Sequence, residues 1–242
     1  MFAPTIRKKE AKSEAERPFW ISYADLMTAM MTLCLVVMAV TIIAINQRLV
    51  AELSGEEQRA KEIRDICEAI QTRLQGQGGV HVDCKDNRID FGEAGRFGDN
   101  DFRLHPDAEQ SLAVLVPVVL DVANGDVGKK WLKQVVIEGY ADPRGSYLYN
   151  LFLSLQRSYW VMCTLVDERM NQNLGLTSEQ VNQVRQLFLA GGVSFNDPKD
   201  SDAASRRVEL RLQFYTRKEK DEAAQSARPR IVASSVDKCN LQ

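Results

Sequence analysis

Histidine is scarce in this 242-residue sequence and occurs only at positions 81 and 105. His81 and His105 lie outside any metal-ligand spacing, and the only serine near an acid-rich loop has no histidine partner in its sequence context. A Gly-Lys-Ser or Gly-Lys-Thr loop for phosphate is also absent. The sequence therefore argues against an enzyme, and it predicts neither a metal site nor a bound cofactor.

A surplus of positive charge is missing as well. Lys and Arg number 31 against 33 Asp and Glu, which gives a formal net charge of −2. A protein that binds nucleic acid concentrates basic residues on one face to neutralise phosphates. No such concentration occurs here, so nucleic acid is not an expected partner.

Charge is nearly absent from residues 21–45, where Asp25 is the only charged residue. A helix rises about 1.5 Å per residue and bilayer hydrocarbon is about 30 Å thick, so residues 21–46 are predicted to form a transmembrane helix. A carboxylate inside a bilayer is costly and usually serves ion movement. Because Asp25 lies only about one turn inside the run, its carboxylate could instead simply reach the headgroup region.

The flanks of this run predict its orientation. Basic residues precede it, and acids follow it after a single arginine: Arg7, Lys8, Lys9, Lys12 and Arg17 on one side, Arg48, Glu52, Glu56 and Glu57 on the other. The positive-inside rule then places residues 1–20 in the cytoplasm and everything after the helix in the periplasm of a bacterial inner membrane. The alternative is a cleaved signal peptide, whose apolar region is shorter, typically about 7–15 residues. No second span is expected, because the apolar run 112–120 is short and contains Pro117.

Beyond the span the sequence predicts a linker and one compact domain. Apolar residues at helical spacing make residues 47–79 an amphipathic linker helix. Alternating or apolar runs predict a β-hairpin around residues 80–91 and strands at 132–139 and 208–214, and helices are expected from Pro106, over 149–170 and over 177–190. Residues 80–216 therefore read as an α/β (α+β) domain with a small mixed sheet. The polar residues 217–242 are predicted to form a disordered tail.

The five cysteines divide between the span and the exported part. Cys34 lies in the span, and the other four would lie in a compartment that permits disulfides. Cys67 and Cys84 flank the entry to the domain and are the expected disulfide pair. Cys163 lies on the apolar face of a predicted helix and is expected to be a buried thiol.

One group of motifs lies at the end of the strand 132–139. Residues 137–145 read IEGYADPRG, and Asn150, Ser154 and Arg157 follow at intervals, with Phe97 upstream and SRRVE at 205–209. This set resembles the OmpA-like peptidoglycan-binding domain over roughly residues 80–215. The resemblance implies that Asp142 and Arg157 hold the amine and the carboxylate of diaminopimelate in the stem peptide of the cell wall. Ala141 departs from the family, which often has Thr there.

The chemistry of these residues suits that ligand without the resemblance. A zwitterionic amino-acid end needs an acid for its ammonium and a guanidinium for its carboxylate, which Arg can bind bidentately. Asn150 is either a third ligand contact or the cap of the helix that follows. The alternative for Asp142 and Arg157 is a structural salt bridge that orders a loop.

The span carries a second motif. Residues 18–28 read PFWISYADLMT, which resembles the transmembrane helix of MotB-type stator subunits around their ion-carrying Asp. Within that class the sequence is more similar to the ZorB subunits of Zorya anti-phage systems than to flagellar MotB. Ser22, Thr28 and Thr32 lie on the face of Asp25, and together with Tyr23 they are the expected residues of an ion path.

These resemblances imply a function and a set of partners. The chain is expected to be an ion-conducting, peptidoglycan-anchored stator subunit of a proton-driven inner-membrane rotary motor that acts in anti-phage defence. Two copies of the chain would stand inside a ring of five multi-span subunits of the ZorA or MotA kind, with H⁺ favoured over Na⁺ as the translocated ion. The alternatives are a flagellar MotB-type stator subunit and a passive tether between the inner membrane and the wall.

Overall fold

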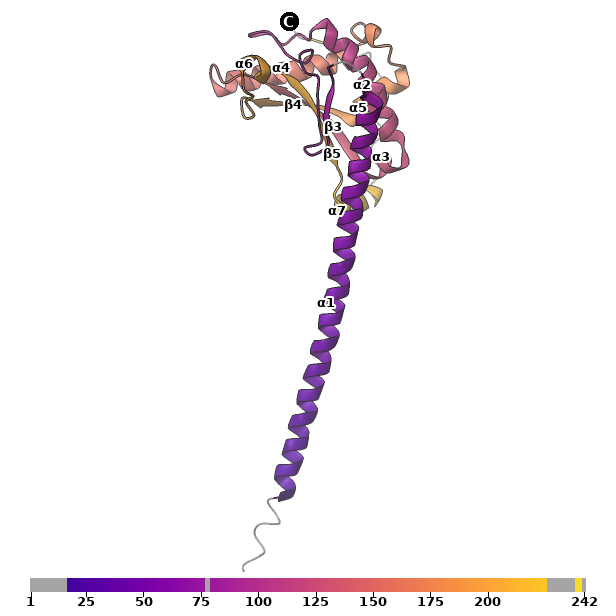
Figure 1. Cartoon of the computed structure of the whole chain (residues 1–242), viewed down its shortest axis with the longest axis vertical. Helices are drawn as coiled ribbons and strands as arrows, with labels where there is room; N and C mark the ends of the chain where they lie inside the picture. Colours follow the sequence, from indigo (N-terminus) through magenta and orange to yellow (C-terminus); the bar gives the residue numbers. More distant parts are fainter. Residues whose placement is uncertain (1–16, 77–78, 226–237, 241–242) are drawn as a thin grey trace, which may run out of the picture. The chain divides into compact units, whose positions relative to one another are not determined.

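The computed structural model describes residues 17–76, 79–225 and 238–240 (Figure 1). The chain divides into two compact units, Met1–Arg59 and Ala60–Gln242. The predicted cytoplasmic residues 1–20 lie mostly outside the described part of the chain, and so do residues 226–237 of the predicted tail. The predicted fold class is confirmed: one long apolar helix is followed by an α/β domain with a five-stranded mixed sheet.

The first helix, α1, runs from Arg17 to Leu74 and has 58 residues. Within the described chain it is the one helix long and apolar enough to cross a membrane, with a mean hydropathy of 2.5 over its most apolar 18 residues. The span and the linker helix predicted separately are one continuous element, because Gly55 is the only helix-weakening residue between them and an interior Gly costs only about 1 kcal/mol. The helix ends before Gly76, whose φ of 86° few other residues adopt.

The last turns of α1 belong to the globular unit. Ile66, Cys67, Ile70 and Leu74 are all buried in its hydrophobic core. The predicted domain start at residue 80 is therefore too late, because the apolar face of the linker helix packs inward. Cys67 of this face is joined to Cys84 by a disulfide, the expected pair.

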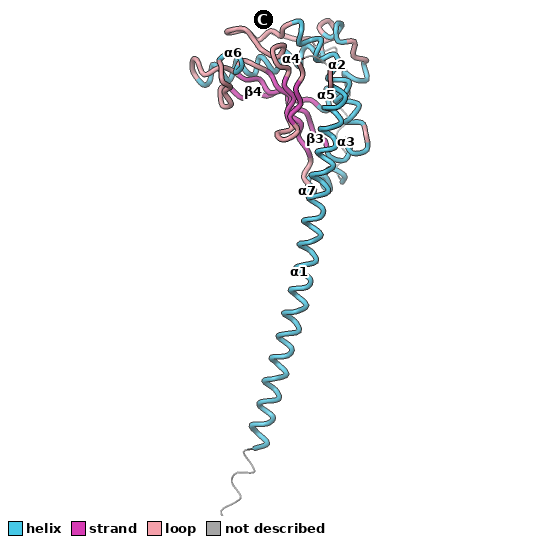
Figure 2. The backbone as a smooth tube through the Cα atoms, in the orientation of Figure 1, coloured by secondary structure: helices cyan, strands magenta, loops and turns pink. Residues whose placement is uncertain are grey.

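The sheet has the order β1-β2-β5-β3-β4, and its strands are drawn in magenta in Figure 2. Its strands are β1 (His81–Asp83), β2 (Arg88–Asp90), β3 (Leu132–Tyr140), β4 (Phe188–Ser194) and β5 (Val208–Phe214). All neighbours are antiparallel except β3 and β4. The register places Gly139 of β3 opposite Val208 of β5, so the residues just after β3 lie beside those just before β5.

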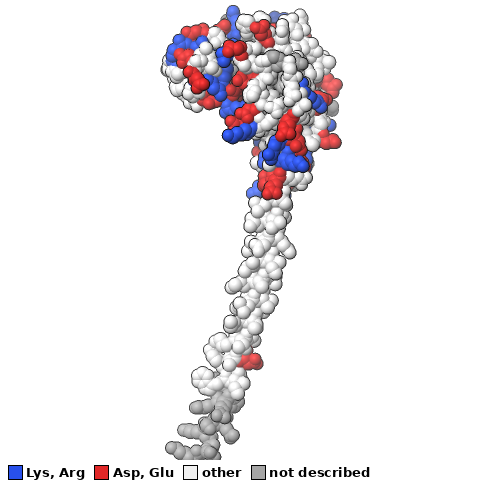
Figure 3. All heavy atoms as spheres, viewed as in Figure 1, with Lys and Arg blue, Asp and Glu red and all other residues white. Residues whose placement is uncertain are grey.

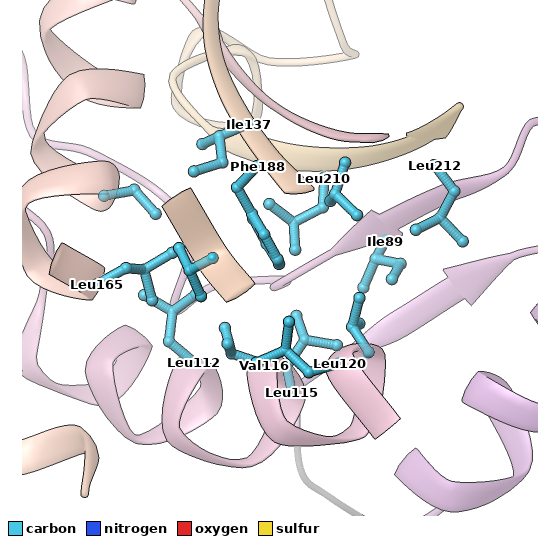
Figure 4. Packing of buried hydrophobic residues seen from close by; sticks show 14 of the residues in the cluster. Ile89, Leu112, Leu115, Val116, Leu120, Ile137, Leu165, Phe188, Leu210 and Leu212 are labelled. Atoms are coloured by element: carbon cyan, nitrogen blue, oxygen red, sulfur yellow. The ribbon is translucent and has the colours of Figure 1, made fainter. Parts of the chain in front are cut away.

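The apolar face of this sheet packs against α2 (Pro106–Asn124), α4 (Tyr147–Val166) and α5 (Ser178–Leu187). The other helices of this unit are α3 (Asp126–Trp131), η1 (Asn171–Leu174), α6 (Asp202–Ser205) and α7 (Arg217–Gln225). Leu112 and Val116 of α2 point toward Ile137 and Leu210 of the sheet, with Phe188 between them (Figure 4). On the opposite face, Arg211 of β5 pairs with Glu138 of β3 at 3.1 Å. Period-two alternation determines which side of β5 is buried, because Val208, Leu210 and Leu212 all belong to the core.

One strand was not expected. The helix predicted over residues 177–190 ends at Leu187, and β4 begins directly at Phe188. The capping box at its start is present, with Thr177 and Gln180 bonding each other's backbone. β4 was missed because it is an edge strand with two central glycines, Gly191 and Gly192, and no loop separates it from the helix.

The predicted disordered tail and the predicted free thiol are both wrong where the structure describes them. Residues 217–225 form α7, and Cys239 is joined to Cys163 by a disulfide. The backbone N–H of Cys239 also donates to the Asp167 carboxylate at 2.8 Å, and this bond, followed by those from Arg169, lowers the pKa of Asp167 to about 2. A contact between residues 76 positions apart leaves no trace in local composition, so the sequence pattern could not predict it.

Gly139 sets the distance between β3 and α4. A Cβ atom at this position would lie 2.0 Å from the backbone oxygen of Ser154. We therefore expect Gly139→Ala to push α4 off the sheet and to lower the free energy of unfolding by about 3 kcal/mol. Urea unfolding of the full chain in detergent micelles, followed by tryptophan fluorescence, measures this change.

Gly191 offers the matched control for that variant. It lies on the neighbouring strand, and a Cβ there would meet only the Val136 side chain, at an ordinary 3.5 Å. Gly191→Ala should be close to neutral. If both substitutions lowered the free energy of unfolding equally, the cause would be the loss of a glycine from a strand, and not the distance between α4 and the sheet.

Candidate functional site

The membrane segment holds the first candidate residue, Asp25. Figure 3 shows the apolar stretch of α1 in white, with one red acidic group in it. Two of the expected path residues bond to their own helix: Thr28 Oγ1 donates to the Asp25 carbonyl oxygen and Thr32 Oγ1 to that of Ala29, each at 2.9 Å. Both hydroxyl hydrogens are therefore donated to the backbone of the helix. In an ion path along this face, each hydroxyl oxygen would still be able to accept a hydrogen bond.

The second candidate site is centred on Asp142. This residue is the second after the end of β3, and its side chain is only 7% exposed. Arg144 binds the carboxylate bidentately, with Nε 3.1 Å from Oδ1 and Nη2 2.8 Å from Oδ2. Arg206, just before β5, donates from Nη1 to Oδ2 at 3.0 Å. The β3–β5 register brings these two distant segments together.

The two guanidinium groups fix the charge of Asp142. Hydrogen bonds from Arg144 and then Arg206, against the opposing effect of burial, hold the pKa of Asp142 well below its usual range. A folded-state pKa below the unfolded one stabilises the fold at neutral pH, and this contribution is lost as the pH falls through the usual range of an Asp carboxyl and below it. The carboxylate is therefore ionised under all ordinary conditions and is suited to binding a cation.

Arg157 lies within α4 and has no exposed surface. Its guanidinium donates to three backbone carbonyl oxygens, those of Asp101 at 2.9 Å, Tyr140 at 2.6 Å and Gly98 at 3.2 Å. It also lies over the Phe97 ring, 4.9 Å from the centroid. Burial, and after it the charge of Arg206, lowers the pKa of Arg157 to about 10. This side chain ties the loop 97–101 to the end of β3.

The structure bears on two alternatives that the sequence leaves open. Asp142 pairs with Arg144 and Arg206 and makes no salt bridge to Arg157, so the two residues do not order the loop by pairing with each other. The cap of α4 is Ser146, whose hydroxyl accepts from the backbone N–H of Tyr149, so Asn150 is not the helix cap. Asn150 is buried, and its amide donates to the Arg144 carbonyl oxygen at 2.7 Å, which holds the loop between β3 and α4.

Two arginines of this site were not assigned a role from the sequence. Arg144 lies in the ADPRG segment and Arg206 in the SRRVE segment, so both belong to motifs that the sequence displays. The motifs show that these residues are near the site but not that both bind one carboxylate. That contact depends on strand register, which a single sequence does not show.

A second buried polar network supports the site from the charged face of the sheet. The Arg207 guanidinium lies 4.0 Å from the centroid of the Tyr140 ring and donates from Nε to Glu209 at 2.6 Å. The Tyr140 hydroxyl donates to Glu138 at 2.6 Å. Tyr140 lies two residues before Asp142, and Arg207 is the residue after Arg206. This network therefore holds in place both the segment that carries the carboxylate and the segment that carries its Arg206 partner.

The family model described as membrane MotB of the proton-channel complex MotA/MotB matches residues 6–52. Zorya protein ZorB of Escherichia coli O139:H28 (strain E24377A / ETEC) is 52% identical over 236 residues, which cover 97% of this chain and 95% of that protein. The chain belongs to the ZorB family. It is thus a MotB-type, stator-like subunit, as the motif around Asp25 predicts.

Solved structures similar to this ZorB-family chain are more distant. A putative MotB-like protein from Desulfovibrio vulgaris is 19% identical and covers 66% of this chain and 96% of its own, with a TM-score of 0.44. The periplasmic domain of Helicobacter pylori MotB is 12% identical and covers 57% and 82%, with a TM-score of 0.37. The OmpA-like domain of FopA1 from Francisella tularensis subsp. tularensis SCHU S4 is 21% identical and covers 57% and 82%, with a TM-score of 0.35.

Proposed function

We propose that this ZorB-family chain is the ion-conducting, wall-anchored stator subunit of a proton-driven rotary motor in the bacterial inner membrane, acting in defence against phage. The observation that carries the proposal is the presence of two sites on one chain. A lone carboxylate lies on an apolar span, and a guanidinium-held carboxylate lies in the globular domain. The name of the E. coli relative supports the link to a Zorya system.

Asp25 is the ion carrier of this proposal. An apolar environment disfavours the charged form of a carboxylate, so the group takes a proton from the periplasmic side and releases it where its surroundings become wetter. Each elementary charge that crosses the membrane releases about 2.3 kcal/mol per 100 mV. This energy is enough to bias one step of a partner ring.

The partner of the span is a multi-span subunit of the MotA or ZorA kind. A single helix cannot enclose a path for ions, since its one face needs other helices to exclude lipid. Two copies of this chain inside a ring of such subunits supply the enclosure, and the N-terminus of each lies in the cytoplasm.

In this proposal the globular domain binds the peptidoglycan of the cell wall. A fixed attachment in the periplasm prevents the subunit from turning while the ring rotates. The ligand is the zwitterionic end of diaminopimelate in the stem peptide, with Asp142 as the partner of its ammonium. Arg157 and Asn150 hold the loops around Asp142 in place, because both side chains are buried and donate to backbone carbonyl oxygens of these loops.

Asp142→Asn tests the wall half of the proposal. The neutral amide cannot hold an ammonium by charge, so binding of the full chain to purified diaminopimelate-containing sacculi should fall at least about tenfold. Co-sedimentation of the detergent-solubilised protein with sacculi measures the loss, and circular dichroism verifies the fold of the variant.

Asp167→Asn is the matched control. Asp167 is a buried carboxylate at the opposite end of α4, and it binds the arginine two positions on, as Asp142 binds Arg144. A helix of 20 residues separates the two sites by about 30 Å. Sacculus binding should survive in this variant; unchanged binding in Asp142→Asn, or equal losses in both, would remove Asp142 from the wall site.

A further inference from the structure

The Asp142 carboxylate has no vacant acceptor position. Its Oδ1 accepts from the backbone N–H and from Nε of Arg144, at 3.0 and 3.1 Å. Its Oδ2 accepts from Nη2 of Arg144 and from Nη1 of Arg206, at 2.8 and 3.0 Å. A carboxylate offers about four lone-pair sites, so all of them are filled. An incoming ammonium must therefore displace one of these donors.

The two arginines differ in how firmly they are held. The Arg206 side chain is 15% exposed, and its Nε also donates to the Phe97 carbonyl oxygen at 3.1 Å. The Arg144 side chain is 53% exposed and can leave without opening the core. Arg144 is therefore the donor that an ammonium can replace.

Two further acids lie ready to hold the displaced guanidinium. Arg144 already contacts Asp99 at 2.7 Å and Asp202 at 3.4 Å, and both carboxylates are more than half exposed. An arginine that swings away from Asp142 keeps these partners. Its displacement thus costs one bidentate contact and leaves no unpaired charge behind.

We propose that Arg144 is a built-in counter-ion that fills the ammonium position of the wall site and is exchanged for the ammonium of the ligand. This inference rests on the proposed function and adds to it a rule of selectivity. Ligands that carry a free ammonium complete the exchange, whereas an acetylated amine leaves Asp142 with its own arginine and gains nothing there. The empty site also stays neutralised, so the buried carboxylate never lacks a partner.

Arg144→Ala tests the exchange. Removing the competitor should tighten binding of meso-diaminopimelate to the full chain in detergent by roughly three- to tenfold, the value of one partly exposed charge-assisted contact. Arg144→Lys keeps the charge but not the fork, and should lie between wild type and Arg144→Ala. Isothermal titration calorimetry measures the affinities, and thermal melts verify folding.

Two controls separate exchange from general effects of charge. Arg169→Ala removes the matching arginine beside Asp167 and should leave the affinity unchanged. A probe whose two amines are both acetylated should show no gain in Arg144→Ala.

The outcomes distinguish this inference from the function on which it rests. Weaker or unchanged binding in Arg144→Ala, with wild-type binding intact, overturns the exchange alone and leaves the wall site. An equal gain for the acetylated probe also overturns it, because the effect would then not involve the ammonium. Absence of binding by wild type and every variant overturns the wall-binding function together with the exchange.

Discussion

Replacing Asp25 with Asn is expected to reduce ion flux through the assembled motor to background and to abolish phage protection. Asn has nearly the shape of Asp but neither takes up nor releases a proton, so the carrier step is lost while packing is kept. The neutral side chain is also easier to insert into a bilayer, so the complex should still assemble. Acidification of vesicles that contain the chain and its multi-span partner, read with a pH-sensitive dye, measures the flux.

Two variants show whether the loss is specific to this carboxylate. Asp25→Glu keeps the acid but moves it by one methylene, and should retain partial flux. Glu52→Gln removes an acid of α1 beyond the apolar stretch and should have no effect. Full flux and full protection in Asp25→Asn would reduce the chain to a passive tether between membrane and wall.

Much of the fold follows from local periodicity. The apolar run of α1, the face of Ile66, Ile70 and Leu74, and the alternation in β5 each identify their element, because burial repeats at 3.6 or 2 residues. The elements that sequence analysis missed have no such pattern. β4 carries Gly191 and Gly192 at a sheet edge, and the return of the chain at Cys239 is a contact of long range.

The site divides in the same way. The motifs around Asp142 and Arg157 identify the loop and the helix that carry them, since these residues lie close in the chain. Which groups they bind depends on the fold: Arg206 reaches Asp142 only because β5 pairs with β3. The partners of Arg157 also depend on the fold: its side chain has no exposed surface, and its guanidinium donates to backbone carbonyl oxygens such as that of Tyr140.

Arg157→Ala is expected to have the largest effect on stability of any substitution in the globular unit. It removes the donor of three backbone carbonyl oxygens and the cation that lies over Phe97. A buried acceptor that loses its partner costs about 1–3 kcal/mol, and Arg157 serves three of them. We therefore expect the free energy of unfolding to fall by about 4 kcal/mol. Urea unfolding of the full chain in detergent measures the change.

The variants at this position separate the roles of charge, volume and hydrogen bonding. Arg157→Met fills most of the space but donates nothing, and should be nearly as unstable as Arg157→Ala, because the loop 97–101 still loses its attachment. Arg157→Lys should recover part of the loss, since an ammonium reaches fewer of the three carbonyl oxygens than a planar fork does. Arg169→Ala, at an exposed position three residues beyond the end of the same helix, should change stability by less than about 1 kcal/mol. If Arg157→Met is as stable as wild type, the guanidinium is not structural, and the presence of Arg157 in the motif would then have to be explained by direct contact with the wall peptide.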